Sequence, residues 1–136
     1  MGNKIKSDDG AGSVLAEKLK LKLKIDVIDV ETSLENYLGT IVKLKPGTVI
    51  LIDAVYLKKK PGTIKIITEN NFSIVNFSTH GLSLDFFLNY LKEHKIENFI
   101  IIGIQPKKVD YGTVISLPVI NAMNTIEKTL VKLFSR

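Results

Sequence analysis

Three places in the sequence combine a titratable side chain with the expected start or end of a secondary-structure element. Asp9 lies in an acidic, glycine-containing turn, Asp53 closes an apolar run, and His80 lies in the segment Ser78-Thr79-His80-Gly81. Ligands of open α/β sheets bind at the carboxyl ends of the strands, so such side chains can meet at one edge. Two carboxylates and one imidazole could ligate a divalent metal with coordination positions left open, or perform acid–base hydrolysis.

Each candidate also has an ordinary structural interpretation. In Asp8-Asp9-Gly10-Ala11-Gly12 an aspartate could cap the next helix, and the glycines could permit a tight turn. This explains one aspartate, but not two of them beside two glycines. Asp53 either reaches solvent or serves a site, because a buried carboxylate without a partner is costly. His80 could be an ordinary loop histidine. His94, the other histidine, is interpreted as a surface residue near the end of a helix, where a cation suits the helix dipole.

The elements that must position these side chains alternate along the chain. Continuous apolarity or period-two alternation predicts strands, and apolar residues at steps of three and four predict helices. Strands are expected at 25–30, 48–53, 63–68 and 98–104; helices are expected at 12–24, 33–44 (capped by Ser33) and 83–95, with a last helix that has Pro118 in its first turn. This order predicts an α/β fold: one domain over residues 1–136, a three-layer sandwich with a mostly parallel sheet and helices on both faces.

Composition narrows the function classes. The chain has 136 residues, of which 45% are hydrophobic and 24% charged, as in an ordinary globular domain. The absence of cysteine excludes disulfides, thiol catalysis and thiolate metal sites. No apolar run approaches the length of a membrane span, and no Gly-Lys-Ser/Thr follows the glycines, so phosphate transfer is not indicated. Eighteen lysines stand against a single arginine, which argues against a specialised nucleic-acid reader.

Several short motifs occur in a characteristic order and spacing. They are Gly2-Asn3, Asp8-Asp9-Gly10-Ala11-Gly12, Val27-Ile28-Asp29, Leu34-Glu35-Asn36, Leu51-Ile52-Asp53-Ala54, Pro61-Gly62, Ser78-Thr79-His80 and Gly103-Ile104-Gln105-Pro106. In this series the sequence resembles the nickel–iron hydrogenase maturation endopeptidases over nearly its whole length. It looks closest to the subgroup that processes the large subunit of the formate-lyase-type hydrogenase.

The resemblance implies a function and a site. Members of the family remove a C-terminal extension from the hydrogenase large subunit after nickel insertion, and they are classed as aspartic-type peptidases. The family's three nickel-contacting residues fall on Asp9, Asp53 and His80, with Asp8 as a supporting carboxylate. The implied partner is the large-subunit precursor, and nickel arrives with it and binds the free protein weakly. A cytoplasmic monomer is expected, without nucleic-acid partners and without membrane insertion.

Two other functions are compatible with the same fold. One is a non-catalytic nickel-sensing or chaperone-like binding module, and the other is an α/β domain that binds an anion at the turn 10–12. The carboxylates could also act in two ways in a peptidase: they could activate water directly, or hold the substrate's nickel so that the scissile bond is placed for attack. The sequence leaves these alternatives open.

The start of the sequence departs from the family pattern. Val30-Glu31 stands where the family usually has small residues, and this affects the expected shape of the cleft. The apolar strand that should lead into Gly2-Asn3 is missing. We expect the natural protein to carry about five to eight more, mostly apolar, residues. Without them, 27–30 and 48–53 are expected to have backbone groups that lack partners.

Overall fold

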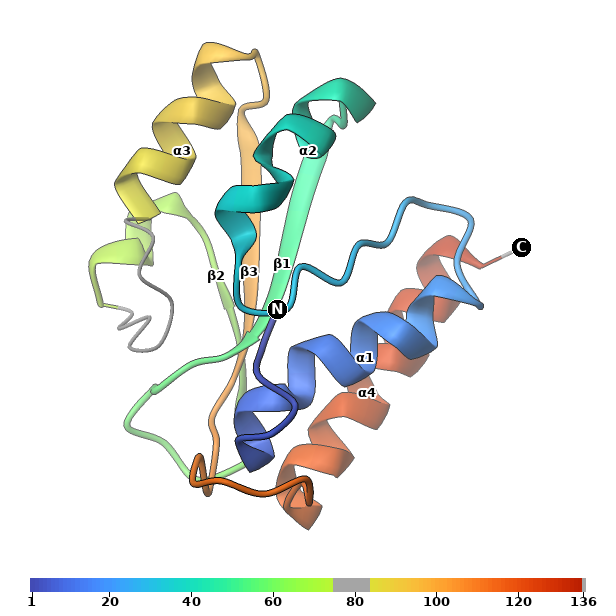
Figure 1. Ribbon diagram of the computed structural model, residues 1–136, viewed down its shortest axis with the longest axis vertical. Helices are drawn as coiled ribbons and strands as arrows, with labels where there is room; N and C mark the ends of the chain where they lie inside the picture. The colour runs from blue at the N-terminus through green and yellow to red at the C-terminus, as the bar shows by residue number, and fades with distance from the viewer. Residues whose placement is uncertain (75–83, 136) are drawn as a thin grey trace.

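The computed structural model describes residues 1–74 and 84–135 of the chain. Figure 1 shows its helices and strands in the order of the sequence. Short 3-10 turns precede two of the α-helices, so the chain tightens before each of these helices begins. The elements are η1 (Ser7–Gly10), α1 (Ala11–Lys20), η2 (Leu34–Tyr37), α2 (Leu38–Leu44), β1 (Thr48–Ala54), β2 (Ile64–Ile67), η3 (Glu69–Ile74), α3 (Leu84–Glu93), β3 (Asn98–Ile104) and α4 (Leu117–Phe134).

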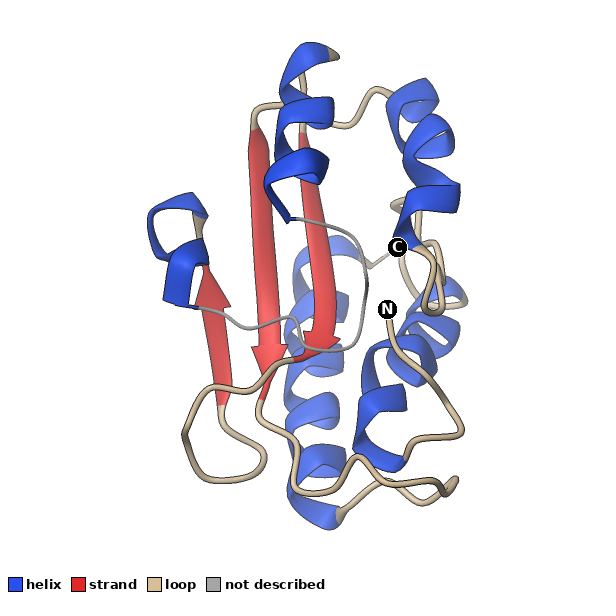
Figure 2. Ribbon diagram, turned by 60° about the vertical axis from the view of Figure 1, so that its left-hand side comes forward, coloured by secondary structure: helices blue, strands red, loops and turns tan. Residues whose placement is uncertain are grey.

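The described strands form one mixed sheet in the order β1-β3-β2 (Figure 2). β1 and β3 run parallel, with Thr48 opposite Asn98 and Ala54 opposite Ile104. β2 runs antiparallel to β3. β3 has neighbours on both sides, and this agrees with its continuous apolar sequence. The parallel pair puts the carboxyl ends of β1 and β3 at the same edge of the sheet.

Helices cover both faces of this sheet (Figures 1 and 2). Side chains of α2 and α3 pack with Leu51, Phe99 and Ile101 in one core cluster. Side chains of α1 and α4 pack with Ile102 and Ile104 in a second cluster on the other face. The alternation of strand residues between two faces therefore creates two cores. The expected α/β fold in three layers is confirmed.

Residues 25–30 do not form the expected strand, and that prediction was wrong. The alternation of Ile25, Val27 and their neighbours suits a strand, but the segment has no β-ladder partner in the described chain. A strand exists only through pairing, which a local pattern cannot supply. The expected side-chain cap by Ser33 is also absent.

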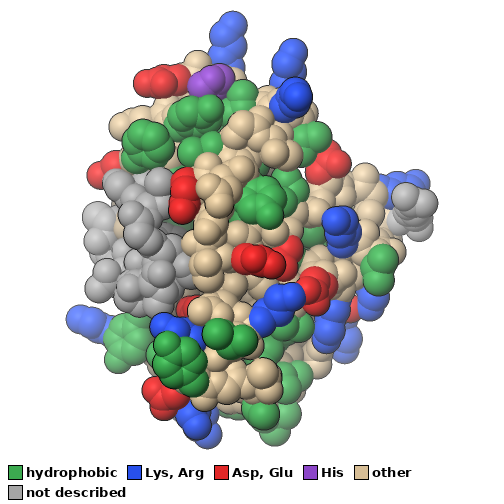
Figure 3. Space-filling model, in the orientation of Figure 1, with side chains coloured by type: hydrophobic (Ala, Val, Ile, Leu, Met, Phe, Trp, Pro, Cys, Tyr) green, Lys and Arg blue, Asp and Glu red, His purple; other side chains and the backbone are tan. Residues whose placement is uncertain are grey.

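The helices keep the predicted positions with shorter ends. α1 ends at Lys20, earlier than expected, and α4 has Pro118 in its first turn. Four of the five spaced apolar residues of α4, Val119, Met123, Ile126 and Leu130, are buried, whereas Leu133 is 65% exposed. No helix in the described ranges is long and apolar enough to span a membrane. Acidic and basic side chains are interspersed on the face drawn in Figure 3.

Candidate active site

Asp53 lies near the carboxyl end of β1, as the sequence predicts. Its side chain is fully buried at 0% exposure, although the strand around it is otherwise apolar. Its opposite residue in β3 is Gly103, which has no side chain. Strand alternation puts Asp53 on the same face as Leu51, which belongs to the core beneath α2 and α3. A carboxylate buried at the end of a strand is costly, and such a position is typical of a functional site.

Asp9 reaches the same end of the sheet from η1. The side chain is 3% exposed, and the Asn3 backbone amide lies 3.3 Å from Asp9 Oδ2 and 3.1 Å from the Asp9 carbonyl oxygen. The backbone amide of Asp9 donates to the Lys6 carbonyl at 3.1 Å. The acidic turn is therefore folded against residues 3–6, and neither of its aspartates caps α1.

The amino group of Met1 is buried near several acidic side chains. It donates a hydrogen bond to the Ile52 carbonyl at 2.9 Å, one residue before Asp53. Burial lowers the pKa of this amino group below its ordinary value of 8.0, and the negative charges of Asp53, Asp29 and Asp9 act in the opposite direction. Asp53, Asp29 and Asp9 therefore all lie near this amino group. The structure brings Asp9 and Asp53, two of the predicted site residues, together at the end of β1.

His80, the third predicted site residue, lies outside the described residues. Within the described ranges no group of three His, Cys, Asp or Glu side chains could hold a metal ion. Asp9 and Asp53 could supply two oxygen ligands, and a third ligand is needed from elsewhere. His94 is exposed beyond the end of α3, and its Nδ1 lies 2.9 Å from the Tyr90 carbonyl oxygen. The interpretation of His94 as a surface residue is confirmed.

Asp8 has a different role from its neighbour. Its carboxylate accepts hydrogen bonds from the backbone amides of Lys107 (2.8 Å), Lys108 (3.0 Å) and Ser116 (2.7 Å) and from Ser116 Oγ (2.7 Å). Burial would raise the pKa of Asp8, but these hydrogen bonds outweigh it and hold the pKa below the ordinary value of 3.8. Asp8 therefore fixes the segment 107–116, and with it the start of α4, next to Asp9.

Gln105 is a buried polar residue of the motif Gly103-Ile104-Gln105-Pro106, and the sequence reasoning gave it no role of its own. It is 3% exposed, and its Oε1 accepts hydrogen bonds from the amides of Leu57 (2.6 Å) and Lys59 (3.4 Å). Its backbone joins the same region, since the Gly62 amide donates to the Gln105 carbonyl at 2.8 Å. Gln105 therefore holds the chain that follows β1. One feature of the sequence could have indicated this role: Gln105, the single glutamine of the chain, directly follows the apolar strand 98–104.

Glu31 lies on the other side of the N-terminal residues. Its backbone φ is 50°, in the left-handed region that favours glycine, and its carbonyl accepts the Gly2 amide at 2.8 Å. The side chain of Glu31 is exposed, whereas Val30 is buried in the core. The departure from small residues at 30–31 is thus accommodated by a left-handed turn with its charged side chain directed to solvent.

Comparison with known proteins gives the chain a family. Residues 11–133 match the family model described as hydrogenase maturation protease, named HycI. The hydrogenase 3 maturation protease of Escherichia coli strain K12 is 33% identical over 133 residues, which are 96% of this chain and 85% of that protein. A putative hydrogenase maturation protease of Methanocaldococcus jannaschii is 31% identical over 121 residues, 82% of this chain and 72% of that protein.

Solved structures agree with this result. The crystal structure of the hydrogenase 3 maturation protease has a TM-score of 0.84 at 33% identity, covering 95% of this chain and 84% of that one. The HycI maturation protease of Thermococcus kodakarensis KOD1 has a TM-score of 0.86 at 26% identity, covering 97% and 86%. The layered α/β fold is that of the solved hydrogenase maturation proteases. The chain belongs to the hydrogenase maturation protease family.

Proposed function

We propose that this protein is an endopeptidase that removes the C-terminal extension of a nickel–iron hydrogenase large-subunit precursor. The observation that carries the proposal is the convergence of Asp9 and Asp53, both buried, at the carboxyl end of β1. Membership of the hydrogenase maturation protease family supplies the reaction class. The related protein from Escherichia coli is named as the protease of one particular hydrogenase, and this supports a large-subunit precursor as the substrate.

The nickel carried by the precursor is the recognition element in this proposal. Carboxylates favour a cation, and Asp9 and Asp53 are both buried at this end of the molecule. A nickel ion that arrives with the substrate would meet these two carboxylates, with His80 as the third ligand implied by the family. The thiolates of the substrate would supply the selectivity for nickel, since oxygen and imidazole ligands alone favour copper.

Binding the nickel in this way positions the peptide bond for hydrolysis. Hydrolysis forms a bond from the water oxygen to the carbonyl carbon and breaks the C–N bond, and the departing amine takes up a proton. A buried carboxylate can accept the proton from water and return it to the amine, which corresponds to an aspartic-type peptidase. Anchoring the substrate on a fixed metal lowers the entropic cost of reaching this geometry. We place the reaction in the cytoplasm, where the precursor is expected.

Mass spectrometry of a nickel-loaded precursor incubated with the protein tests this function. We expect the mass of the precursor to fall by that of its C-terminal extension. Asp53→Asn and Asp9→Asn should slow cleavage at least about 100-fold, because each removes a charge at constant size. Asp26→Asn is the matched control, since Asp26 is exposed, and should cleave at the wild-type rate.

The outcomes distinguish the peptidase from a binding module. If the protein binds the precursor and leaves its mass unchanged, the non-catalytic nickel-sensing alternative is correct. If Asp26→Asn slows cleavage as much as Asp53→Asn does, the assignment of the site to the buried aspartates is wrong.

A further inference from the structure

The loops that follow β1 and β3 carry an excess of positive charge. Both loops lie at the end of the sheet to which the acidic turn of η1 also comes (Figures 1 and 2). Segments 55–63 and 105–116 contain five lysines and a single acidic residue, Asp110. The five lysines are all exposed, and we call them the basic rim; they are Lys58, Lys59, Lys60, Lys107 and Lys108. Exposed positive charge therefore lies beside the buried carboxylates of the candidate site.

Hydrogen bonds hold the backbone of both loops. The Gln105 side chain accepts the amide of Leu57, directly before the basic rim begins, at 2.6 Å. The Asp8 carboxylate accepts the amides of Lys107 at 2.8 Å and Lys108 at 3.0 Å. Because the backbone is already fixed here, a partner that binds the lysines has to order only their side chains.

The charges of the basic rim are available to a partner. Within residues 1–74 and 84–135, its ammonium groups form no ion pair with an Asp or Glu side chain, whereas Lys4 pairs with Glu17 and Lys22 pairs with Glu127. Asp8, the carboxylate next to the rim, is 0% exposed and is bonded to backbone amides instead. Desolvation of the rim by a partner is therefore favourable only if that partner brings negative charge.

Large apolar side chains are exposed in the same two loops. Their exposed fractions are 59% for Tyr56, 44% for Val109, 79% for Tyr111 and 78% for Val114. Lys6 adds a further cation, with its Nζ 5.6 Å from the centre of the Tyr111 ring. Figure 3 shows basic and hydrophobic side chains next to each other along the lower part of the molecule. Exposed apolar side chains grouped in this way mark protein interaction surfaces, and aromatic ones often anchor them.

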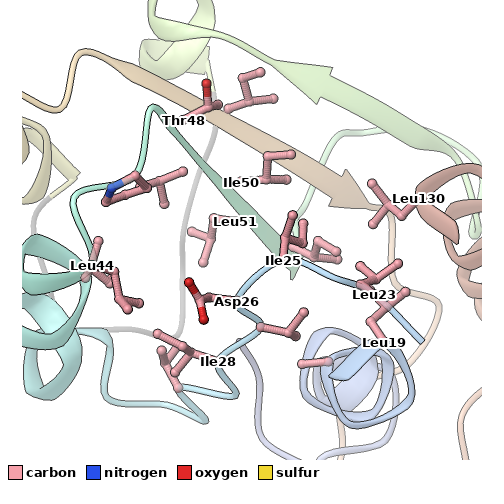
Figure 4. Close-up of a pocket in the computed structure, with 18 of the residues that line it drawn as sticks. Leu19, Leu23, Ile25, Asp26, Ile28, Leu44, Thr48, Ile50, Leu51 and Leu130 are labelled. Atoms are coloured by element: carbon pink, nitrogen blue, oxygen red, sulfur yellow. The ribbon is translucent and has the colours of Figure 1, made fainter. Parts of the chain in front are cut away.

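The pocket beside β1 has a different character (Figure 4). It has a volume of about 770 Å³ and is lined mainly by apolar side chains, among them Ile25, Ile28 and Ile50. Lys24 and Asp26 are the charged side chains of its described lining, and their charges are opposite. A negatively charged partner therefore finds its complement at the basic rim and not in this pocket.

We propose that the basic rim binds an acidic segment of the large-subunit precursor and so holds the substrate beside Asp9 and Asp53. This inference rests on the proposed function, because it names how the substrate of that function is recognised. The two charge patterns are complementary to one substrate: buried carboxylates meet its cation, and outer lysines meet its acidic side chains. Such complementarity speeds the encounter and fixes the orientation of the partner.

A nucleic acid matches this surface less well than an acidic polypeptide does. The two loops contain no arginine, which is the residue that reads base edges with paired hydrogen bonds. Lysine ammonium groups act as point charges, and surface carboxylates are sufficient partners for them. The exposed tyrosines and valines add apolar contacts of the kind that a polypeptide provides.

Two charge-matched triple variants of the full chain test the proposal. One removes three lysines of the basic rim: Lys59→Gln, Lys107→Gln and Lys108→Gln. The control removes three exposed lysines that come shortly before β1 and β3, at the opposite end of the sheet: Lys43→Gln, Lys45→Gln and Lys95→Gln. Each triple variant has a formal net charge of +2 instead of +5, so a difference between them reports position and not total charge.

Fluorescence anisotropy with labelled, nickel-loaded precursor measures the affinity of each protein. We expect the Kd of the rim variant to be at least about tenfold weaker than that of the wild type, and the Kd of the control to stay within about twofold. Raising the NaCl concentration from about 50 mM to about 500 mM should weaken the wild type more than the rim variant, because salt screens exposed charges. Tyr111→Ala should weaken binding at least about fivefold, whereas Leu21→Ala, at a position 89% exposed on α1's far end, should not.

Three results would overturn the proposal. They are equal affinities of the two triple variants, a wild-type affinity that does not depend on salt, and a single-stranded oligonucleotide that binds the wild type at least as tightly as the precursor does. The substituted lysine side chains are exposed, so every variant should melt within about 2 °C of the wild type. A precursor that binds through the rim and is not cleaved would contradict the proposed function alone, whereas cleavage with binding independent of the rim would contradict this inference alone.

Discussion

Asp8 and Asp9 are adjacent in the sequence and have different roles in the structure. Asp8 accepts hydrogen bonds from Lys107, Lys108 and Ser116 and serves as a structural anchor. Asp9 contacts Asn3 and, like Asp53 and Asp29, lies near the Met1 amino group. The two side chains leave the same 3-10 turn in different directions. Asp8 therefore supports the structure around the site, and Asp9 is the one placed to take part in the reaction.

The anchor at Asp8 should be visible in stability. Asp8→Ala leaves the amides of 107, 108 and 116 without their acceptor, and we expect the free energy of unfolding to fall by about 2–4 kcal/mol. Asp26→Ala, at an exposed position, should change it by less than about 0.5 kcal/mol. Urea denaturation of both variants measures the difference. A loss for Asp8→Ala no larger than the control would contradict the anchoring role.

Asp8 also predicts how stability depends on pH. Its pKa in the folded protein is below the ordinary 3.8, so the folded state binds the proton less readily than the unfolded chain does. The stabilisation is therefore fully present above the unfolded pKa and is lost as the pH falls through the folded pKa. Wild-type protein should lose more stability than Asp8→Ala does below about pH 3.8. Parallel acid titrations of the two proteins, monitored by circular dichroism, measure this difference. An equal loss of stability in both proteins would refute the prediction.

The two histidines provide a second contrast between residues. His80→Ala should abolish precursor cleavage and leave Tm within about 2 °C, because the family resemblance assigns His80 to nickel contact rather than to packing. His94→Ala should retain wild-type cleavage, since His94 is exposed and its ring lies against Tyr90 at the end of the helix. Cleavage rates and melting curves of both variants check this. Equal losses of activity, or unfolding of the His80 variant, would refute the assignment.

At the scale of elements, continuous apolar runs predicted strands more reliably than alternation of apolar and polar residues did. The runs 48–53 and 98–104 predicted β1 and β3 to within one residue, because strands covered on both faces leave a clear signal. The alternating segment 25–30 was wrong as a strand, since an isolated pattern does not reveal whether a partner is present. Ser33 failed as a cap for a similar reason: its sequence context is suitable, but the chain enters η2 in another conformation.

The contact between α1 and the end of β1 gives a test at the same scale. A Cβ added at Gly12 would lie 2.2 Å from the Met1 carbonyl oxygen and 2.4 Å from that of Ile52, so Gly12→Ala must displace the helix. We expect it to cost at least about 2 kcal/mol of stability. Gly39→Ala is the matched control, because a Cβ there meets nothing within 4 Å, and it should stabilise α2 by about 0.5–1 kcal/mol.

Denaturation curves of the two alanine variants measure these changes. A Gly12→Ala protein as stable as wild type would show that α1 does not pack against Met1 and Ile52 as described. Its cleavage rate should fall with its stability, because α1 follows directly from the turn that holds Asp9.

At the scale of the whole molecule, the sequence predicted the layered fold and two meeting carboxylates better than it predicted their support. Asp9 and Asp53 could be inferred because each lies at the end of an element, where α/β sheets bind ligands. The role of Asp8 could not, since its partners lie 99 to 108 residues away along the chain. The role of Gln105 could not be predicted for the same reason, because its hydrogen-bond partners Leu57 and Lys59 lie 48 and 46 residues away along the chain.

The isolated protein should bind nickel weakly. The chain has no cysteine, so the expected ligands are two carboxylates and one imidazole, without a thiolate. Titration calorimetry with nickel alone should give a dissociation constant no tighter than about 10 μM, a binding free energy of about −7 kcal/mol. Tight stoichiometric binding would show that the metal resides in this protein rather than arriving with the substrate.

The central claim is that the substrate's nickel directs cleavage at Asp9 and Asp53. The most direct test compares the rates at which the wild-type protein cleaves nickel-loaded and nickel-free precursor at equal concentration, followed by mass spectrometry. We predict that the loaded precursor is processed at least about 100-fold faster, because the metal positions the scissile bond. Equal rates for the two precursors would contradict the account.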